Sequence, residues 1–278
     1  MLCLMLHFDR AACSPRYGNK FLHQGRLAIT LSRMRLPPSL LLLVLSSAAG
    51  FAQDVAKPAP AAPVEVAGEP SHHLKVENEY VRAYFVEIAP GQSTLMHHHG
   101  TDYVAVAIGA SEVDSVVPDG TTKHITFHDG QVNYAPAGVV HAVRNQGAAP
   151  FRNATIELLQ NQGHPVCVKD CENDPRAKEW PALPDTAKAI GYGDSFRIIA
   201  VTIKPQQTVS VTDPSPHLVV LLTDAQARSA GPSKPPQDVS HHAGDLLFHE
   251  PHPPGTTTTN TGAQDIRLVE IQFKPVKQ

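Results

Sequence analysis

Short runs of apolar or alternating residues recur along the chain. The clearest lie at 84–88, 103–108, 111–116 and 155–159, and they are rich in Val, Ile, Tyr and other residues that favour strands. Pro-Gly, Asp-Gly and Pro-Ala-Gly segments separate the runs and are typical of turns. The pattern therefore predicts an all-β chain of short strands.

The chain contains an internal repeat. Residues 82–90 line up without gaps against 197–205, and the same alignment places 103–108 on 218–223. Further matches join Gly130 to Gly244, Asn145 to Asn260, and 156–159 to 269–272. The repeat predicts two tandem units of about 100 residues that share one fold, and closed barrels or sandwiches would hide their strand edges.

The composition excludes two classes of protein, and one apolar run indicates targeting. With 42% hydrophobic and 18% charged residues, the 278-residue chain is neither disordered nor a coiled coil. The leucine-rich run within 34–52 follows Arg35 and ends at the small residues Gly50 and Ala52, the layout of a secretory signal peptide. We expect cleavage before Gln53 and a periplasmic or secreted protein. An uncleaved membrane anchor is the alternative.

The remaining segments outside the repeat lack strand periodicity. Residues 1–33 hold basic residues and two cysteines in no pattern, which indicates an upstream extension and a true start at Met34. Residues 53–71 are rich in Ala and Pro and are interpreted as an extended linker, with order beginning near Leu74. Residues 161–191 connect the two units, predicted at 72–160 and 192–278, and can hold a short helix.

Removal of the front segment changes the charge and the cysteine count. Without residues 1–52 the chain keeps 17 basic and 25 acidic residues, a net charge of −8, so no basic stripe remains for nucleic acid. Cys167 and Cys171 are the two cysteines left, and an exported compartment favours a disulfide between them. A redox or metal-binding pair is the alternative, although the spacing is not Cys-x-x-Cys.

Two segments of the first unit resemble the paired motifs of the cupin superfamily. The first motif, which ends in Glu and Gly in the family, is matched by Gly91, His97 and His99, with Tyr103 in place of Glu and Gly109 one residue early. The second is matched in full by Gly130, Pro136, Gly138, His141 and Asn145. The resemblance covers residues 74–274. It implies a bicupin of two tandem jelly-roll barrels, also called double-stranded β-helices.

The alternation of side chains along a strand agrees with the resemblance. His97 and His99 point to one face of an extended strand and His98 points to the other, while His141 approaches from a second strand. Three neutral imidazoles can hold a divalent transition metal (Fe, Zn, Ni, Mn or Cu) and leave coordination positions open. The alternative is a solvated histidine run with His141 packed in the core.

Tyr103 is a departure from the family pattern. Many cupins use three His and one Glu, so the substitution predicts a three-histidine site here. Such a set resembles that of cupin oxygenases acting on thiols, diketones or gentisate, which hold Fe(II) without a carboxylate. Tyr103 is assigned either a hydrogen-bonding or acid role beside the metal or a packing role inside the barrel.

The second unit is predicted to have lost its ligands. In the alignment the metal-site positions hold Thr212, Pro214, Leu218 and Thr256. No metal is expected there, and the remaining histidines are interpreted as loop residues: His217, His241, His242, His249 and His252.

These observations lead to one functional hypothesis and one alternative. The first is an exported bicupin whose first barrel binds one divalent metal and acts on a small molecule, with Fe(II)-type oxygenase chemistry as the first candidate. The alternative is a non-catalytic periplasmic binding or scaffold protein with a residual metal site. The expected partner is a small molecule, with no nucleic acid, no stable membrane span after cleavage, and a possible homodimer.

Overall fold

The computed structural model describes residues 62–160, 162–163, 165–210, 215–232, 234–252 and 255–276. The predicted upstream extension, the signal peptide and residues 53–61 of the predicted linker lie outside these ranges. None of the helices in the described ranges has the length and apolar character that a membrane span requires.

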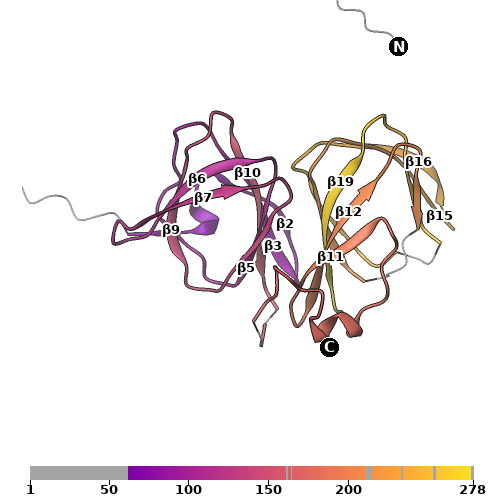
Figure 1. The fold of residues 1–278 in the computed structure, drawn as a ribbon, viewed down its shortest axis with the longest axis horizontal. Coiled ribbons are helices and arrows are strands. Elements are labelled where there is room, and N and C mark those ends of the chain that lie inside the picture. The colour runs from indigo at the N-terminus through magenta and orange to yellow at the C-terminus, as the bar shows by residue number, and fades with distance from the viewer. Residues whose placement is uncertain are drawn as a thin grey trace, which may run out of the picture. The chain divides into compact units, whose positions relative to one another are not determined.

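The first half consists of two five-stranded sheets that face one another (Figure 1). All strand pairs are antiparallel except β1 with β4. In sheet order, one sheet contains β1 (Val64–Glu65), β4 (His97–His98), β9 (Val140–Asn145), β6 (Ser111–Val116) and β7 (Thr122–Phe127). The other contains β2 (His72–Glu77), β3 (Val81–Ile88), β10 (Phe151–Leu158), β5 (Tyr103–Ala107) and β8 (Val132–Ala135).

The second half repeats this arrangement with five and four strands. Its first sheet contains β11 (Ala187–Tyr192), β12 (Phe196–Ile203), β19 (Ile266–Phe273), β14 (His217–Leu221) and β17 (Leu246–His249). Its second sheet contains β13 (Thr208–Ser210), β18 (Thr257–Asn260), β15 (Ala225–Gly231) and β16 (Lys234–His241). The prediction of an all-β fold of two jelly-roll units is confirmed, and the four predicted runs lie on β3, β5, β6 and β10.

Strand β3 shows how both faces of a strand become buried. Val81 and Ala83 point to a hydrophobic cluster that the two halves share, whereas Tyr84, Val86 and Ile88 point into the interior of the first half. Period-two alternation therefore supplies two cores from one strand, which explains its nearly continuous apolar sequence. The shared cluster also includes Val104, Val106 and Ile156 of the first half and Leu218, Val220 and Ile271 of the second.

Strand pairing corrects the alignment of the two halves. In the first half Glu157 lies opposite both Arg82 and Tyr103. In the second half Gln272 lies opposite both Arg197 and His217. His217, and not Leu218, therefore occupies the place of Tyr103, so the gapless alignment was wrong by one residue in this region. The match of 156–159 with 269–272 was wrong by two residues, because Ile156 corresponds to Ile271.

Each half contains an equivalent asparagine that stabilises a turn. The Asn145 side-chain amide donates to the carbonyls of Ile88 (2.9 Å) and Ala149 (2.8 Å), and its Oδ1 accepts from the Gly147 amide (2.9 Å). Asn260 makes the equivalent three bonds in the second half. Both side chains are fully buried. The motif asparagine is thus a structural residue that satisfies buried backbone groups.

We predict that Asn145→Ala lowers the free energy of unfolding by about 2 kcal/mol, because each lost hydrogen bond contributes about 1 kcal/mol and water can replace part of the loss at the exposed turn. Asn260→Ala provides the matched comparison in the second half. Urea denaturation followed by circular dichroism measures both variants. A change below about 0.5 kcal/mol in either would contradict the assignment.

Residues 62–71 are not an extended linker, contrary to the sequence interpretation. They contain β1, which pairs with β4, and a 3-10 helix, η1 (Val66–Gly68), whose Val66 is buried in the interior of the first half. Glu69, just beyond η1, is also buried. The Ala/Pro-rich composition concealed this structure because the segment is held by contacts distant in sequence rather than by its own periodicity.

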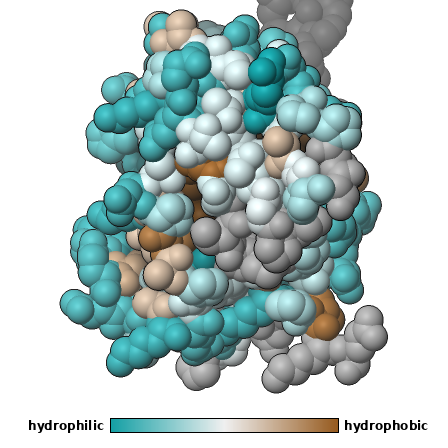
Figure 2. Space-filling view, turned by 90° about the vertical axis from the view of Figure 1, so that its right-hand side faces the viewer, coloured by the Kyte–Doolittle hydropathy of each residue, from teal (hydrophilic) through white to brown (hydrophobic). Residues whose placement is uncertain are grey.

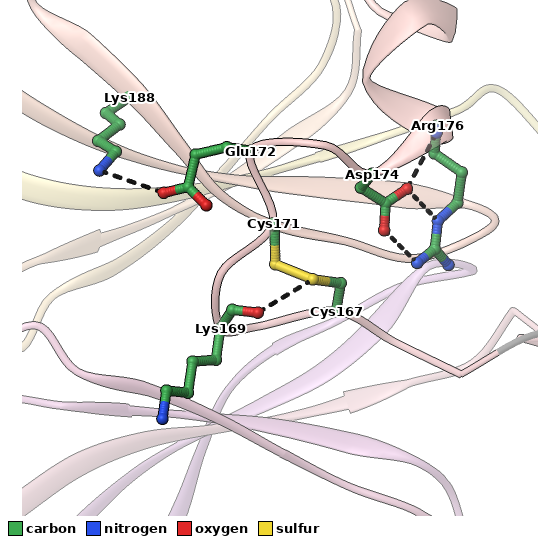
Figure 3. Close-up of a disulfide and its surroundings, with 7 residues drawn as sticks. All are labelled: Cys167, Lys169, Cys171, Glu172, Asp174, Arg176 and Lys188. Atoms are coloured by element: carbon green, nitrogen blue, oxygen red, sulfur yellow. Dashed lines mark hydrogen bonds and ion pairs between the residues drawn. A yellow bond between two sulfur atoms is a disulfide. The ribbon is translucent and has the colours of Figure 1, made fainter.

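The connection between the halves contains the expected disulfide and a short helix. Cys167 and Cys171 are joined (Figure 3). The Cys167 and Tyr192 backbones exchange two hydrogen bonds of 2.9 Å. The 3-10 helix η2 (Pro175–Glu179) begins after Asp174, whose carboxylate accepts from the Arg176 amide. Where Figure 2 is coloured, the surface is mainly hydrophilic and its apolar residues form small patches.

Candidate metal centre

The three consecutive histidines diverge as strand alternation predicts. His97 and His99 are buried, each with 1% of its surface exposed. His98 points outward, and its Nδ1 lies 3.1 Å from the Glu65 carboxylate. The solvated-run alternative therefore fails for His97 and His99 and holds only for His98.

His141 reaches the same place from the neighbouring strand. It pairs directly across from His97 in the β4–β9 ladder. Its ring centroid lies 4.7 Å from that of His97 and 5.3 Å from that of His99. The fold thus brings together the three histidines that the motifs nominated.

A fourth histidine, which the sequence analysis missed, joins this group. His72 on β2 lies with its ring centroid 4.8 Å from His97 and 6.3 Å from His99. One nitrogen each from His72, His97 and His99 lies within 4.8 Å of the others. His72 belongs to neither motif and lies next to the segment interpreted as a linker, so only the pairing of β2 with β3 brings it here.

Hydrogen bonds orient three of the four rings through their Nδ1 atoms. His72 Nδ1 lies 2.6 Å from the Glu69 carboxylate, His97 Nδ1 lies 2.9 Å from the Leu95 carbonyl, and His141 Nδ1 lies 3.1 Å from the Ser115 hydroxyl. A carboxylate or carbonyl that accepts from one ring nitrogen leaves the other nitrogen as a metal donor. This arrangement is typical of histidines that ligate metals.

Several ring nitrogens have no partner of their own. His97 Nε2 and both nitrogens of His99 are buried without a hydrogen bond to any described residue. Such orphaned buried groups are rare in folded proteins unless a ligand satisfies them. Burial lowers the pKa of His97 and His141 to about 4, and burial together with the neighbouring imidazoles lowers that of His99 to about 2. The rings of His97, His99 and His141 are therefore neutral donors at pH 7.

The Glu69 carboxylate contacts two of the segments that carry the histidines. Burial by itself raises its pKa, but hydrogen bonds from His72 and from the amides of Leu95 and Ser71 bring the pKa below its usual value. The carboxylate is therefore ionised at neutral pH. It binds His72 directly and also anchors the residue whose carbonyl orients His97.

The spacing of the rings fits a single metal ion. A metal–nitrogen distance of 2.0–2.1 Å places each ring centroid roughly 3.2 Å from the ion, so adjacent ligands have centroids about 4.5–5.3 Å apart and opposite ligands about 6.4 Å apart. The separations from His97 to His72, His99 and His141 are 4.8, 4.9 and 4.7 Å, and that from His72 to His99 is 6.3 Å. The residues present fit a divalent transition metal, which imidazole ligands suit.

The histidines line one cavity in the first half, with a volume of about 380 Å³. Apolar residues of the interior form most of its wall, including Val86, Ile88 and Phe151. Its polar residues include Asn133, Asn153, Thr155 and Lys123. The volume lies within the range of small-molecule sites.

Comparisons with known proteins agree with this architecture. No family model matches the chain. It is 35% identical over 75 residues to the beta-alanine degradation protein BauB of Pseudomonas aeruginosa, which covers 27% of this chain and 78% of BauB. The chain belongs to the same family as BauB. AerE from Microcystis aeruginosa has a similar structure, with a TM-score of 0.50 and 16% identity over 74% of this chain and 99% of AerE.

A cupin domain from Bordetella pertussis Tohama I is 26% identical and has a TM-score of 0.30, over 35% of this chain and 96% of that domain. The repeat, the paired motifs, the histidine cluster and the jelly-roll sheets of both halves show the cupin superfamily. The chain is a bicupin.

In this bicupin the position of the usual cupin glutamate is filled by a packed aromatic ring. Tyr103 is buried and stacks on His99, with ring centroids 4.0 Å apart and an interplanar angle of 18°. Burial raises the pKa of its hydroxyl to about 12. Asp102 points away from the histidines and accepts from the Tyr134 hydroxyl and the Ala137 amide. The contact with His99 supports the packing role, and Tyr103 remains a cavity-lining residue.

The histidines of the second cupin unit are not all loop residues, contrary to the sequence interpretation. His217 begins β14, His241 ends β16 and His249 ends β17. His242 and His252 lie outside strands. Burial, with the neighbouring His217, His252 and His241, lowers the pKa of His249 to about 4. Thr212 and Pro214 lie outside the described residues, and Thr256 keeps its place four residues before Asn260.

Proposed function

We propose that this bicupin binds one divalent transition metal through His72, His97, His99 and His141 and uses it to catalyse an oxygenase-type reaction on a small molecule. The observation that carries the proposal is the convergence of buried, unpartnered ring nitrogens on one cavity of the first half. Fe(II) held by these four residues would supply open coordination positions and the redox chemistry that an oxygenase needs.

The residues of the cavity indicate which substrates fit. Asn133 Nδ2 is buried and donates to no described residue, so it can donate a hydrogen bond to a substrate oxygen. Lys123 on β7 supplies a cation to the lining, and on the facing sheet Thr155 donates to Asn153, which lies on the same strand β10. The rest of the cavity wall is mainly apolar. We therefore propose a small acid or carbonyl compound with an apolar body as the substrate.

The test begins with metal-free protein loaded anaerobically with Fe(II). Oxygen consumption is then measured over a panel of thiols, diketones and phenolic acids, with metal content determined in parallel. We expect one or more compounds to stimulate uptake in the wild type and none to do so in His99→Ala. Metal binding without uptake across the panel would contradict the oxygenase proposal and favour a binding or scaffold protein.

Tyr103 tests whether the neutral ligand set is needed for turnover. We predict that Tyr103→Glu tightens divalent metal binding on the order of tenfold, because it adds an anionic donor beside His99, and that oxygen uptake falls because the donor occupies a position that substrate needs. Tyr103→Phe keeps the ring and should retain both properties. Metal titration and oxygen uptake measure the pair. Unchanged affinity in Tyr103→Glu would show that this position does not reach the metal.

We also propose that the protein is exported after cleavage before Gln53. The layout of residues 34–52 and the Cys167–Cys171 disulfide support this proposal, since disulfides persist in oxidising compartments. We predict that N-terminal sequencing of the protein from the exported fraction gives Gln53 or a neighbour. A cytoplasmic product that begins at Met34 would contradict it.

A further inference from the structure

Three histidines gather in the second half, outside the site described above. The ring centroids of His217, His249 and His252 lie 5.1, 5.3 and 5.2 Å apart in the three pairs. The three separations are nearly equal, so the rings form one compact cluster. They also fall within the range of about 4.5–5.3 Å that adjacent imidazoles on one ion require.

Two structural features of the first-half site recur in this cluster. His217 and His249 lie directly opposite one another in the β14–β17 ladder, as His97 and His141 do in the β4–β9 ladder. His217 Nδ1 lies 2.9 Å from the carbonyl of Ser215, two residues earlier, just as His97 Nδ1 lies 2.9 Å from the carbonyl two residues before it. Because the Ser215 carbonyl accepts a hydrogen bond from Nδ1 of His217, Nε2 is the nitrogen that can bind a metal.

Strand alternation turns two of these rings toward the interior of the second half. Val219 and Leu221, on the same face of β14 as His217, belong to the interior cluster of that half. Leu247, two residues before His249, packs against the same cluster. His217 is 5% exposed. His217 and His249 therefore lie at the edge of a hydrophobic interior, where polar groups need a partner.

The cluster does not occupy the place of the first-half site. His217 corresponds to Tyr103, and its cross-strand partner His249 corresponds to Ala135, which lies opposite Tyr103. The ligands would thus come from β14, β17 and the following loop, in the sheet that contributes to the shared cluster. The arrangement is a relocated set of donors rather than a remnant of the paired motifs.

We propose that His217, His249 and His252 form a second metal site, which binds Zn²⁺ or a similar divalent transition metal. Three neutral imidazoles are a donor set that Zn²⁺ accepts readily. Of the three residues, His217 lines a cavity of about 100 Å³, against about 380 Å³ in the first half, which leaves little room for a substrate beside His217. Its role is structural: the metal fastens the loop after β17 to the β14–β17 pair.

Charged groups near the cluster are compatible with a cation. Arg197 lines the same cavity, but its Nη1 donates to the Pro181 carbonyl at 2.7 Å and its guanidinium lies 4.9 Å from the centre of the Trp180 ring. The Glu270 carboxylate lines the cavity as well and offsets that charge. Because Glu270 offsets the charge of Arg197, a divalent ion in the cluster would not lie beside an uncompensated positive side chain.

The test is the stoichiometry of Zn²⁺ on the full chain. Metal-free protein is titrated with Zn²⁺, dialysed and analysed for zinc. We expect two ions per wild-type chain, one in His249→Ala, one in His252→Ala, and a loss of at least 100-fold in affinity for the second ion in both. His242→Ala, at an exposed neighbouring histidine, is the matched control and should keep two.

The first-half site serves as an internal check of folding. Each second-half variant should still bind one Zn²⁺, and His99→Ala combined with His249→Ala should bind none. One ion per wild-type chain, or two ions in both His249→Ala and His252→Ala, would overturn the second site. Two ions in His99→Ala would instead overturn the first-half assignment. His252 lies in a loop and is half-buried, so its variant keeps the test informative if His249→Ala does not fold.

Discussion

His99→Ala is expected to weaken divalent metal binding at the first-half site by on the order of 100-fold or more. Changes to residues that merely orient a ligand cost 10- to 100-fold in affinity, and loss of a ligand removes a bond to the ion as well. Of the four proposed ligands His99 has the strongest structural support, because both of its ring nitrogens are buried without a partner in the described part of the chain. His141→Ala should behave in the same way.

The measurement is a Zn²⁺ titration of metal-free protein by calorimetry. His98→Ala is the matched control, since His98 precedes His99 but points outward toward Glu65. The metal affinity of His98→Ala should equal that of the wild type. His99→Gln preserves most of the side-chain volume and separates ligand loss from a packing defect. Wild-type affinity in His99→Ala and His141→Ala would place the metal elsewhere.

The second large effect is expected at His72, the ligand that the motifs did not indicate. His72→Ala removes one of four imidazoles and should weaken metal binding by about 100-fold. Glu69→Gln keeps His72 but removes the negative charge beside its Nδ1, which lies 2.6 Å from the carboxylate. The affinity of Glu69→Gln for the metal should fall about tenfold, because a neutral amide stabilises the metal-bound ring less than a carboxylate does.

His73→Ala supplies the control for this pair, because His73 adjoins His72 on β2 and is exposed. The same calorimetric titration measures all three variants. A three-histidine site made only of the motif residues predicts wild-type affinity for His72→Ala, so that result would remove His72 from the ligand set. An equal loss in His72→Ala and His73→Ala would indicate general damage to β2.

The sequence by itself determined the fold class and most of the site. Period-two alternation separated His97 and His99 from His98, since neighbouring side chains of a strand point to opposite faces. The spacing of the second motif nominated His141, and the same motif nominated Asn145, which fastens a turn. Local geometry sufficed for the alternation, whereas His141 and Asn145 came from the resemblance to the second cupin motif.

The tertiary structure alone decided what depends on contacts between distant segments. His72 joins the site because β2 pairs with β3. Residues 62–71 are held by the β1–β4 pair, by the buried Val66 and by the hydrogen bonds of Glu69. The placement of His217 opposite His249 required the ladder of β14 and β17, since the gapless alignment had shifted this strand by one residue. A shift of one residue exchanges the two faces of a strand, so only the pairing shows which histidines share an interior.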